Sequence, residues 1–157
     1  MTLVVVVGGI ILILDQAVKW IVLHALPPGV PVIVIDGFFS LTLVMNPGLA
    51  FGMLGTVPPG WRWVVALLSM VAVGVLATIA TRLLPEGGRV AAVAIGMIFG
   101  GAAGNLIDRA RFGAVVDFLD FYWRGWHWPA FNVADSAISV GVALLALRML
   151  TASPPQA

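Results

Sequence analysis

The sequence contains no cysteine and little charge. Only 10% of its 157 residues are charged, against roughly 25% in an ordinary soluble domain. The chain therefore lacks the polar shell of a water-soluble domain, and a hydrophobic content of 61% excludes an intrinsically disordered chain. A net charge of +1 gives no electrostatic footprint for nucleic acid. Without cysteine there is no disulfide, no thiolate metal site and no cysteine nucleophile. An integral membrane protein remains.

Four apolar stretches are long enough to cross a bilayer, which takes about 20 helical residues. They cover about residues 3–23, 61–84, 90–107 and 133–150. The pattern predicts one domain over residues 1–157, with four transmembrane helices and both termini on the same side. The first span carries Asp15 and Lys19 and lacks a basic start, so a cleavable signal peptide is not expected. The distribution of arginines does not place the termini in the cytoplasm.

Two segments between the spans are more than connecting loops. Residues 32–44 are rich in β-branched and aromatic side chains and contain Asp36-Gly37, which predicts a hairpin of two short strands. Residues 111–130 hold three tryptophans and a tyrosine, a density that suits the membrane–water interface. Both segments lie on the side opposite the termini.

Most of the acidic residues gather on that same side. Five of the seven lie in or beside the predicted helix ends there, namely Asp15, Asp108, Asp117, Asp120 and Asp135. Charge within a bilayer is costly and is often functional. Asp15 and Lys19 are four residues apart and share a helix face, which fits either a self-neutralising pair or a pair that lines a site.

The third span carries a glycine stripe at Gly96, Gly100 and Gly104. Small residues at this spacing let another helix approach closely, so the glycines themselves indicate helix packing. Asn105, Asp108 and Arg109 follow at the end of the stripe, where close packing would hold polar groups rigidly. Arg109 could pair there with Asp108 or with a neighbouring carboxylate.

Two further aspartates each allow a structural and a functional interpretation. Asp117 is a lone carboxylate among apolar neighbours; it is either an interfacial surface residue or a desolvated acid with a raised pKa. Asp135 follows Asn132 at the start of the fourth span, where helix capping alone would explain it. Two carboxyls in contact would share a proton. Such a pair could act as base toward water and as acid toward a leaving amine.

Five short boxes in this order resemble the lipoprotein signal peptidases, the type II signal peptidases of bacteria. They are Asp15-Gln16-Ala17-Val18-Lys19, Asn46-Pro47-Gly48-Leu49-Ala50-Phe51-Gly52, Gly101-Ala102-Ala103-Gly104-Asn105-Leu106-Ile107-Asp108-Arg109, Val115-Val116-Asp117-Phe118 and Phe131-Asn132-Val133-Ala134-Asp135. Any one box is weak evidence, whereas five in order with four apolar spans are strong. Leu49 is a mild departure, since the family often has a smaller residue there.

The resemblance implies an all-α membrane protein with four transmembrane helices, a small extracytoplasmic β-sheet or cradle over residues 32–51, and an interfacial arm after Asp117. It implies an aspartic endopeptidase that needs no metal or cofactor and cuts before the diacylglyceryl-modified cysteine of a prolipoprotein. Asp117 and Asp135 would be the catalytic pair. Supporting or substrate-binding roles would fall to Asp15, Lys19, Asn46, Asn105, Asp108, Arg109 and Asn132.

The same resemblance implies the surroundings of the enzyme. It places the chain in the bacterial inner membrane, with cytoplasmic termini and the active site on the extracytoplasmic side. Membrane lipids and globomycin, a cyclic peptide antibiotic, would bind it, nucleic acid would not, and a monomer is expected.

Two rival interpretations remain open at this stage. Asp15, Lys19, Asp108 and Asp135 could form the relay of a small proton- or ion-conducting protein, although the polar residues gather on one side. Alternatively, the glycine stripe could be the dimer seam of a structural assembly partner.

Overall fold

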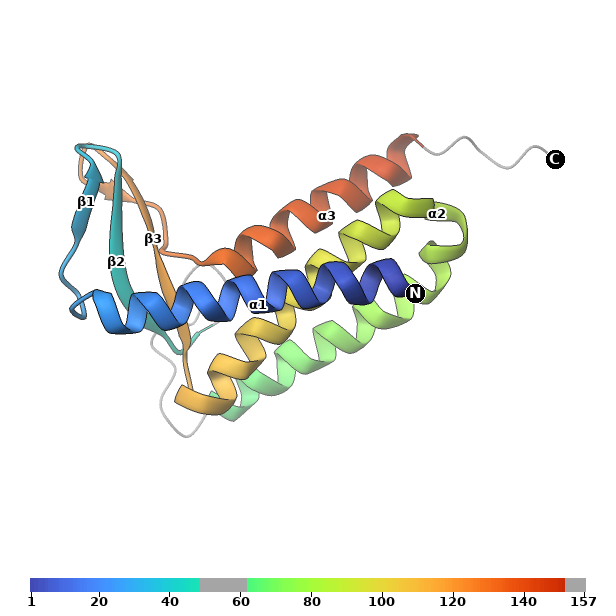
Figure 1. Cartoon of the computed structure of the whole chain (residues 1–157), viewed down its shortest axis with the longest axis horizontal. Helices are drawn as coiled ribbons and strands as arrows, with labels where there is room; N and C mark the ends of the chain where they lie inside the picture. Colours follow the sequence, from blue (N-terminus) through green and yellow to red (C-terminus); the bar gives the residue numbers. More distant parts are fainter. Residues whose placement is uncertain (49–61, 152–157) are drawn as a thin grey trace.

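The structure is a computed structural model that describes residues 1–48 and 62–151. Its helices are α1 (Thr2–Ala25), α2 (Arg62–Phe112) and α3 (Val133–Thr151). Its strands are β1 (Val32–Ile35), β2 (Phe39–Asn46), β3 (Val115–Trp123) and β4 (Trp126–His127). The helices form a bundle, and the sheet lies across one end of it (Figure 1). The N-terminus and the end of α3 lie together at the opposite end.

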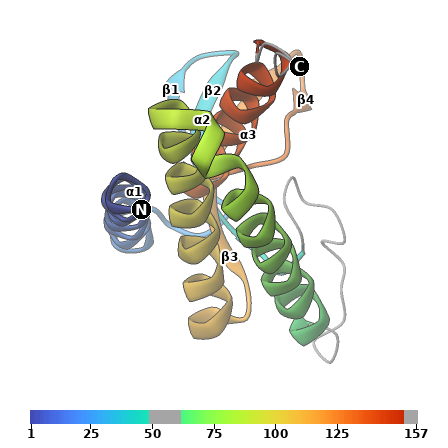
Figure 2. The ribbon, with the colours of Figure 1, turned by 90° about the vertical axis from the view of Figure 1, so that its right-hand side faces the viewer.

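Helix α2 is bent sharply at Gly88. This residue has φ 62° and ψ −149°, a conformation that glycine adopts readily and that residues with a Cβ atom rarely adopt. The chain reverses there, so the part before the bend and the part after it run beside each other (Figure 2). The sequence predicts a break between the spans 61–84 and 90–107, and in the structure the non-helical conformation is confined to Gly88.

Three helical segments in the described part are long and apolar enough to cross a membrane: Thr2–Ala25, Gly88–Phe112 and Val133–Thr151. They match the first, third and fourth predicted spans. The second predicted span, 61–84, is helical from Arg62 onward. Its first residue lies outside the described residues. The chain is thus a mostly helical integral membrane protein with a small sheet.

The glycine stripe on α2 packs against α1 of the same chain. A Cβ at Gly100 would collide with the carbonyl oxygen of Gly8 and lie 2.9 Å from the Cβ of Ile11. A Cβ at Gly96 would lie 2.8 Å from the Cβ of Val7. The prediction of close helix packing is therefore confirmed, and the stripe is used within the chain.

We expect Gly100→Ala to lower the free energy of unfolding by about 1–3 kcal/mol, because an added methyl group overpacks this crossing. Gly9→Ala is the matched control, since nothing lies within 4 Å of a Cβ built there. The control should be neutral or slightly stabilising, because alanine is the better helix former. Unfolding in mixed detergent micelles measures both variants. Equal behaviour of the two would contradict the close contact.

The sheet is antiparallel with the strand order β1-β2-β3-β4. The predicted hairpin is confirmed, since β1 pairs with β2 and the turn between them contains Gly37 at φ 73°. Apolar side chains of the sheet pack on the end of α1, in a cluster of Val22, Leu43, Val116 and Phe118. This packing holds the central strands against the bundle.

The segment after Asp117, which the resemblance implies to be an interfacial arm, contributes strands to the sheet. Residues Val115–Trp123 form β3 and pair with β2 along most of its length. The composition of this stretch, with valine, phenylalanine, tyrosine and tryptophan, favours a strand. The sequence interpretation gave weight to the tryptophans and missed that signal. The cradle expected over residues 32–51 contains β1 and β2, and its last residues lie outside the described ones.

Candidate active site

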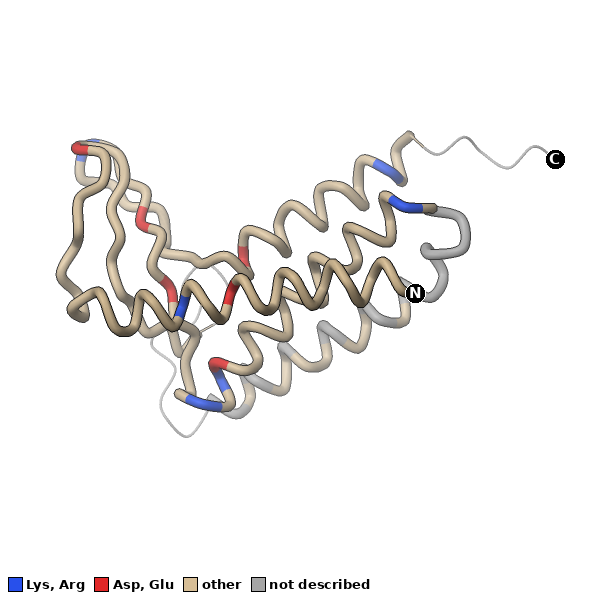
Figure 3. The backbone as a smooth tube through the Cα atoms, in the orientation of Figure 1, with Lys and Arg blue, Asp and Glu red and all other residues tan. Residues whose placement is uncertain are grey.

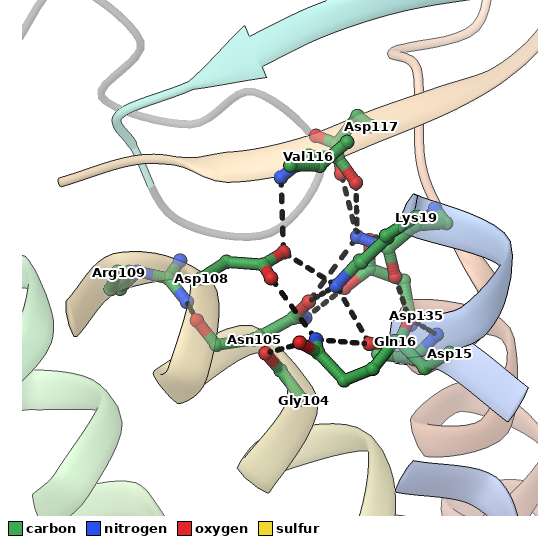
Figure 4. A network of polar contacts seen from close by, with 12 residues as sticks. Asp15, Gln16, Lys19, Gly104, Asn105, Asp108, Arg109, Val116, Asp117 and Asp135 are labelled. Atoms are coloured by element: carbon green, nitrogen blue, oxygen red, sulfur yellow. Dashed lines mark hydrogen bonds and ion pairs between the residues drawn. The ribbon is translucent and has the colours of Figure 1, made fainter. Parts of the chain in front are cut away.

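The predicted site residues meet where the sheet joins the bundle. Charged residues gather at this end of the helices (Figure 3), whereas Arg89 follows the bend of α2 at Gly88 and Arg148 lies in the last turn of α3. Within the network, Asp15, Gln16 and Lys19 come from α1, and Asn105, Asp108 and Arg109 from α2 (Figure 4). Asn46 ends β2, Asp117 lies on β3, and Asn132 and Asp135 stand at the start of α3. All the predicted site residues are therefore brought together.

Asp117 is held by two amides. Asn46 donates from Nδ2 to its Oδ2 at 2.9 Å, and Asn132 donates from Nδ2 to its Oδ1 at 2.7 Å. Its exposed fraction is 2%, so the interpretation as a surface aspartate is wrong. Burial, and next the charge of Asp135, raise the pKa of Asp117 from 3.8 to about 7, against the opposing hydrogen bonds from the two amides.

Asp135 caps its own helix and also faces the network. Its backbone N–H donates to Asn132 Oδ1 at 2.9 Å, while its Oδ2 accepts from the Asn132 N–H at 3.3 Å, as in a capping box. The predicted cap is thus confirmed. Its other oxygen, Oδ1, accepts from Asn105 Nδ2 at 2.8 Å. Capping leaves this second oxygen available to the site.

Asn132 and Asn105 link the two aspartates. Asn132 contacts both carboxyls, through its side chain to Asp117 and its backbone to Asp135. It also donates to Asn105 Oδ1 at 3.2 Å, and Asn105 in turn holds Asp135. After burial, the charge of Asp135 is the next contribution that raises the pKa of Asp117. The pair therefore sits in one polar cluster with both carboxyls fixed by neutral donors.

Lys19 is the cationic centre of the network. Its Nζ lies 2.9 Å from Asp15 Oδ2 and 2.7 Å from Asp108 Oδ2, and it donates to Asn105 Oδ1 at 2.9 Å. Its exposed fraction is 2%. The sequence predicted the pair with Asp15, which the structure confirms. The second carboxylate comes from another helix, so Lys19 joins α1 to α2.

Asp15 and Asp108 also accept backbone hydrogen bonds from other elements. Asp15 Oδ1 accepts from the Ala134 N–H at 3.0 Å, which satisfies an orphan donor at the start of α3. Asp108 Oδ2 accepts from the Val116 N–H at 3.2 Å, beside Asp117. Lys19 and these two carboxylates thus fix the positions of α3 and β3 relative to α1.

Arg109 makes a different contact from the one expected. It donates from Nη2 to the Gly48 carbonyl at 2.9 Å and from Nη1 to the Asn105 carbonyl at 3.3 Å. Among the described residues Arg109 forms no ion pair, and Asp108 is paired with Lys19 instead. Its Nε is buried without a hydrogen-bond partner in the described part of the chain. Arg109 thus braces the turn after β2.

Gln16 is the site residue that sequence reasoning missed. Its Nε2 donates to Asp108 Oδ1 at 3.1 Å and to the Gly104 carbonyl at 3.2 Å. Its place beside Asp15 in the first box was the available signal.

Among the residues that the structure describes, no three His, Asp or Glu side chains converge as a metal-binding group.

Asp120 lies on the same strand as Asp117 but belongs to another cluster. It accepts from Ser40 Oγ at 3.1 Å, and His127 Nδ1 lies 2.9 Å from its Oδ1. Its exposed fraction is 7%. The structure therefore separates the two aspartates of β3 by their partners, and only Asp117 joins the network of Asp135.

Comparisons with known proteins identify the family of the chain. A sequence model of the family described as signal peptidase II matches residues 7–151. The lipoprotein signal peptidase of Geobacter sulfurreducens is 50% identical over 139 residues, covering 88% of this chain and 86% of the relative. That of Nitratidesulfovibrio vulgaris is 41% identical over 150 residues, covering 95% of this chain and 90% of the relative.

Two solved structures, each described as a bacterial membrane enzyme studied by the in meso method, share the fold. One has a TM-score of 0.79 at 26% identity and covers 100% of this chain and 94% of its own. The other has a TM-score of 0.76 at 28% identity, with coverages of 98% and 96%. The chain belongs to the signal peptidase II family and is a membrane peptidase of the aspartic type.

Proposed function

We propose that this chain removes the signal peptide from prolipoproteins that carry a diacylglyceryl-modified cysteine, cutting just before that cysteine. Asp117 and Asp135 are the catalytic pair in this proposal. The observation that carries it is one polar cluster in which Asn132 contacts both carboxyls and Asn105 joins Asn132 to Asp135. The names of the relatives, which are lipoprotein signal peptidases, support the substrate class.

The fold and the family of the chain support a proposed topology. Residues 62–87 form the remaining membrane span, so that four helices cross the bacterial inner membrane. The termini face the cytoplasm, and the sheet and the site face the extracytoplasmic side. The substrate is anchored by its acyl chains and its signal helix, which confines the scissile bond close to the site before any specific contact is made. The acyl chains lie against apolar helix surfaces.

The chemistry needs one proton on the pair. The ionised carboxyl takes a proton from water as the water oxygen attacks the scissile carbonyl carbon. The protonated carboxyl hydrogen-bonds the carbonyl oxygen, and a proton then passes to the leaving amine as the C–N bond breaks. The amides of Asn46, Asn105 and Asn132 hold the carboxyl oxygens in place. Arg109 supplies a donor to the developing oxyanion, since its Nε has no partner in the described part.

The decisive experiment is processing of a purified diacylglyceryl prolipoprotein beside its unlipidated version, each with and without globomycin. The proposal expects cleavage of the lipidated substrate alone, and its inhibition by globomycin. Equal cleavage of both substrates would contradict the proposed specificity.

Nothing in the charge distribution favours the proton-conducting alternative. Residues 2–14, 90–107 and 136–147, which make up most of the three apolar helices, contain no Asp, Glu, Lys or Arg. A proton pathway needs polar groups at several depths in the membrane, and these three stretches provide no charged ones.

A bell-shaped dependence of rate on pH is expected from this pair. At low pH both carboxyls are protonated and no base remains, while at high pH both are ionised and no acid remains. Because the pKa of Asp117 lies at about 7, we expect one limb of the profile near that pH. Steady-state cleavage rates over a pH series measure it.

Asn46→Ala tests whether loss of a proton from Asp117 causes the alkaline limb of the profile, where the rate falls as the pH rises. The Asn46 amide stabilises the ionised form of Asp117 and so lowers its pKa. Its removal should move the alkaline limb to higher pH. A downward move, or a profile that rises steadily with pH, would contradict the assignment of the limb to this pair.

A further inference from the structure

Aromatic side chains form an exposed surface at one end of the sheet. The surface, here called the aromatic tip, consists of Phe38, Trp123, Trp126 and Trp128, with exposed fractions of 46%, 62%, 64% and 46%. These residues border a cavity of about 400 Å³ whose other walls are Phe121, Tyr122 and Phe131. Figure 1 shows the turn between β1 and β2 and the end of β3 together at this end of the sheet.

The aromatic side chains of the tip pack against one another in a defined arrangement. The ring centroids of Trp126 and Trp128 are 6.0 Å apart in an edge arrangement, and Phe39 stacks on Phe121 at 4.6 Å. The turn that carries the tryptophans has Arg124 at φ 50° and Gly125 at φ 81°. Aromatic rings gathered in this way expose much apolar area at a fixed place.

The strand β4 is also held in place by the contacts of His127. His127 stacks on Tyr122 with ring centroids 5.1 Å apart and contacts the buried Asp120 at 2.9 Å. Asp120 in turn accepts from Ser40 on β2. The tryptophans on either side of His127 are therefore held in place while their own rings stay exposed.

Two neighbouring surfaces continue the tip toward lipid. All four residues of β1, Val32, Ile33, Val34 and Ile35, are apolar and exposed. On the other side, Phe131 comes two residues before the apolar helix α3, whose exposed residues include Val140 and Leu147. Phe131 thus links the cavity of the tip, through a short stretch of chain, to a helix long and apolar enough to cross the bilayer.

We infer that the aromatic tip is a membrane anchor, in which Trp123, Trp126 and Trp128 lie among the phospholipid headgroups of the leaflet next to the sheet. Tryptophan has an apolar ring and a polar N–H, and it is enriched at this depth. Arg124, whose guanidinium lies 5.8 Å from the Trp123 ring, adds a cation that suits phosphate groups. The inference uses the membrane nature of the chain and does not depend on the proposed substrate.

Quenching of tryptophan fluorescence by brominated lipids tests the depth of the tip. Trp20→Phe/Trp61→Phe/Trp63→Phe leaves only the three tip tryptophans among the six of the chain. The full chain is placed in vesicles of phosphatidylethanolamine and phosphatidylglycerol, with bromine near the headgroup or near the acyl end. We expect strong quenching by bromine near the headgroup, weak quenching by bromine near the acyl end, and little quenching by iodide on both sides.

A second variant guards against misfolding of the first. Trp126→Phe/Trp128→Phe keeps the tip apolar, and the difference between its emission and that of the unsubstituted chain isolates these two rings. The difference should show the same preference for bromine near the headgroup. Quenching by iodide and not by lipid would overturn the inference. Protection from both quenchers together with cross-linked dimers would also overturn it, since a second copy would then cover the tip.

Discussion

Asp117→Asn and Asp135→Asn should each abolish cleavage of a lipidated prolipoprotein while the chain still inserts and folds. An amide can neither take a proton from water nor return one, and acid–base catalysis of this kind contributes roughly 10²–10⁴-fold to a rate. Each asparagine is close to its aspartate in shape, so the packing around it should hold. Single-turnover cleavage rates on purified protein, with thermal unfolding beside them, measure the two effects separately.

Asp120→Asn is the matched control for these variants. It lies on the same strand as Asp117 and is also buried, but its partners are Ser40, Thr42 and His127. The amide oxygen can still accept from Ser40, and the residue is outside the network of Asp135. We expect most activity to remain. A loss equal to that of Asp117→Asn would mean that the wrong aspartate of β3 was assigned to catalysis.

Stability should respond to Asp117→Asn in the opposite direction from activity. The folded-state pKa of Asp117, about 7, lies above its ordinary value of 3.8, because burial disfavours the charge. The folded chain therefore binds a proton that the unfolded chain releases, and this contribution to stability is lost as the pH rises from about 4 to 7. The asparagine variant carries no such charge. It should be more stable than the unsubstituted chain at pH 8, and the difference should shrink in acid.

The sequence could predict those features that depend on local pattern. The apolar spans, the hairpin around Asp36-Gly37, the glycine stripe and the cap by Asn132 all follow from spacing and residue type within a short stretch. The order of the five boxes pointed to the right family. For the structural features the physical cause is local, whereas the family depends on five boxes spread from Asp15 to Asp135.

The pairing of charges could not be predicted in the same way. Spacing gave the Asp15–Lys19 pair, but the contact of Lys19 with Asp108 joins residues 89 positions apart and depends on how α1 crosses α2. Once Lys19 holds Asp108, Arg109 donates to the carbonyls of Gly48 and Asn105. Likewise, Asp15 caps α3 across the bundle. Tertiary packing decides which of several possible partners each charge takes.

The second large effect, on the stability of the fold, is expected when Lys19 is replaced. Lys19→Met should lower the free energy of unfolding by about 3–5 kcal/mol, because it leaves buried carboxylates without their cation. Asp15 and Asp108 have exposed fractions of 0% and 1%, so water cannot replace the ammonium group. Methionine keeps most of the apolar stem, which limits any loss of packing. Unfolding in mixed micelles at neutral pH measures the change.

The triple variant Asp15→Asn/Lys19→Met/Asp108→Asn separates the two possible causes of that loss. It removes the cation and both of the carboxylates that contact it, so no uncompensated charge from this cluster stays buried. If charge is the cause, the triple variant should recover much of the stability that Lys19→Met loses, since buried ion pairs are often replaceable by neutral groups. If it is as unstable as the single variant, the contribution of Lys19 lies in its hydrogen bond to Asn105 and its packing. In that case the positive charge itself would not be what holds α1, α2 and β3 together.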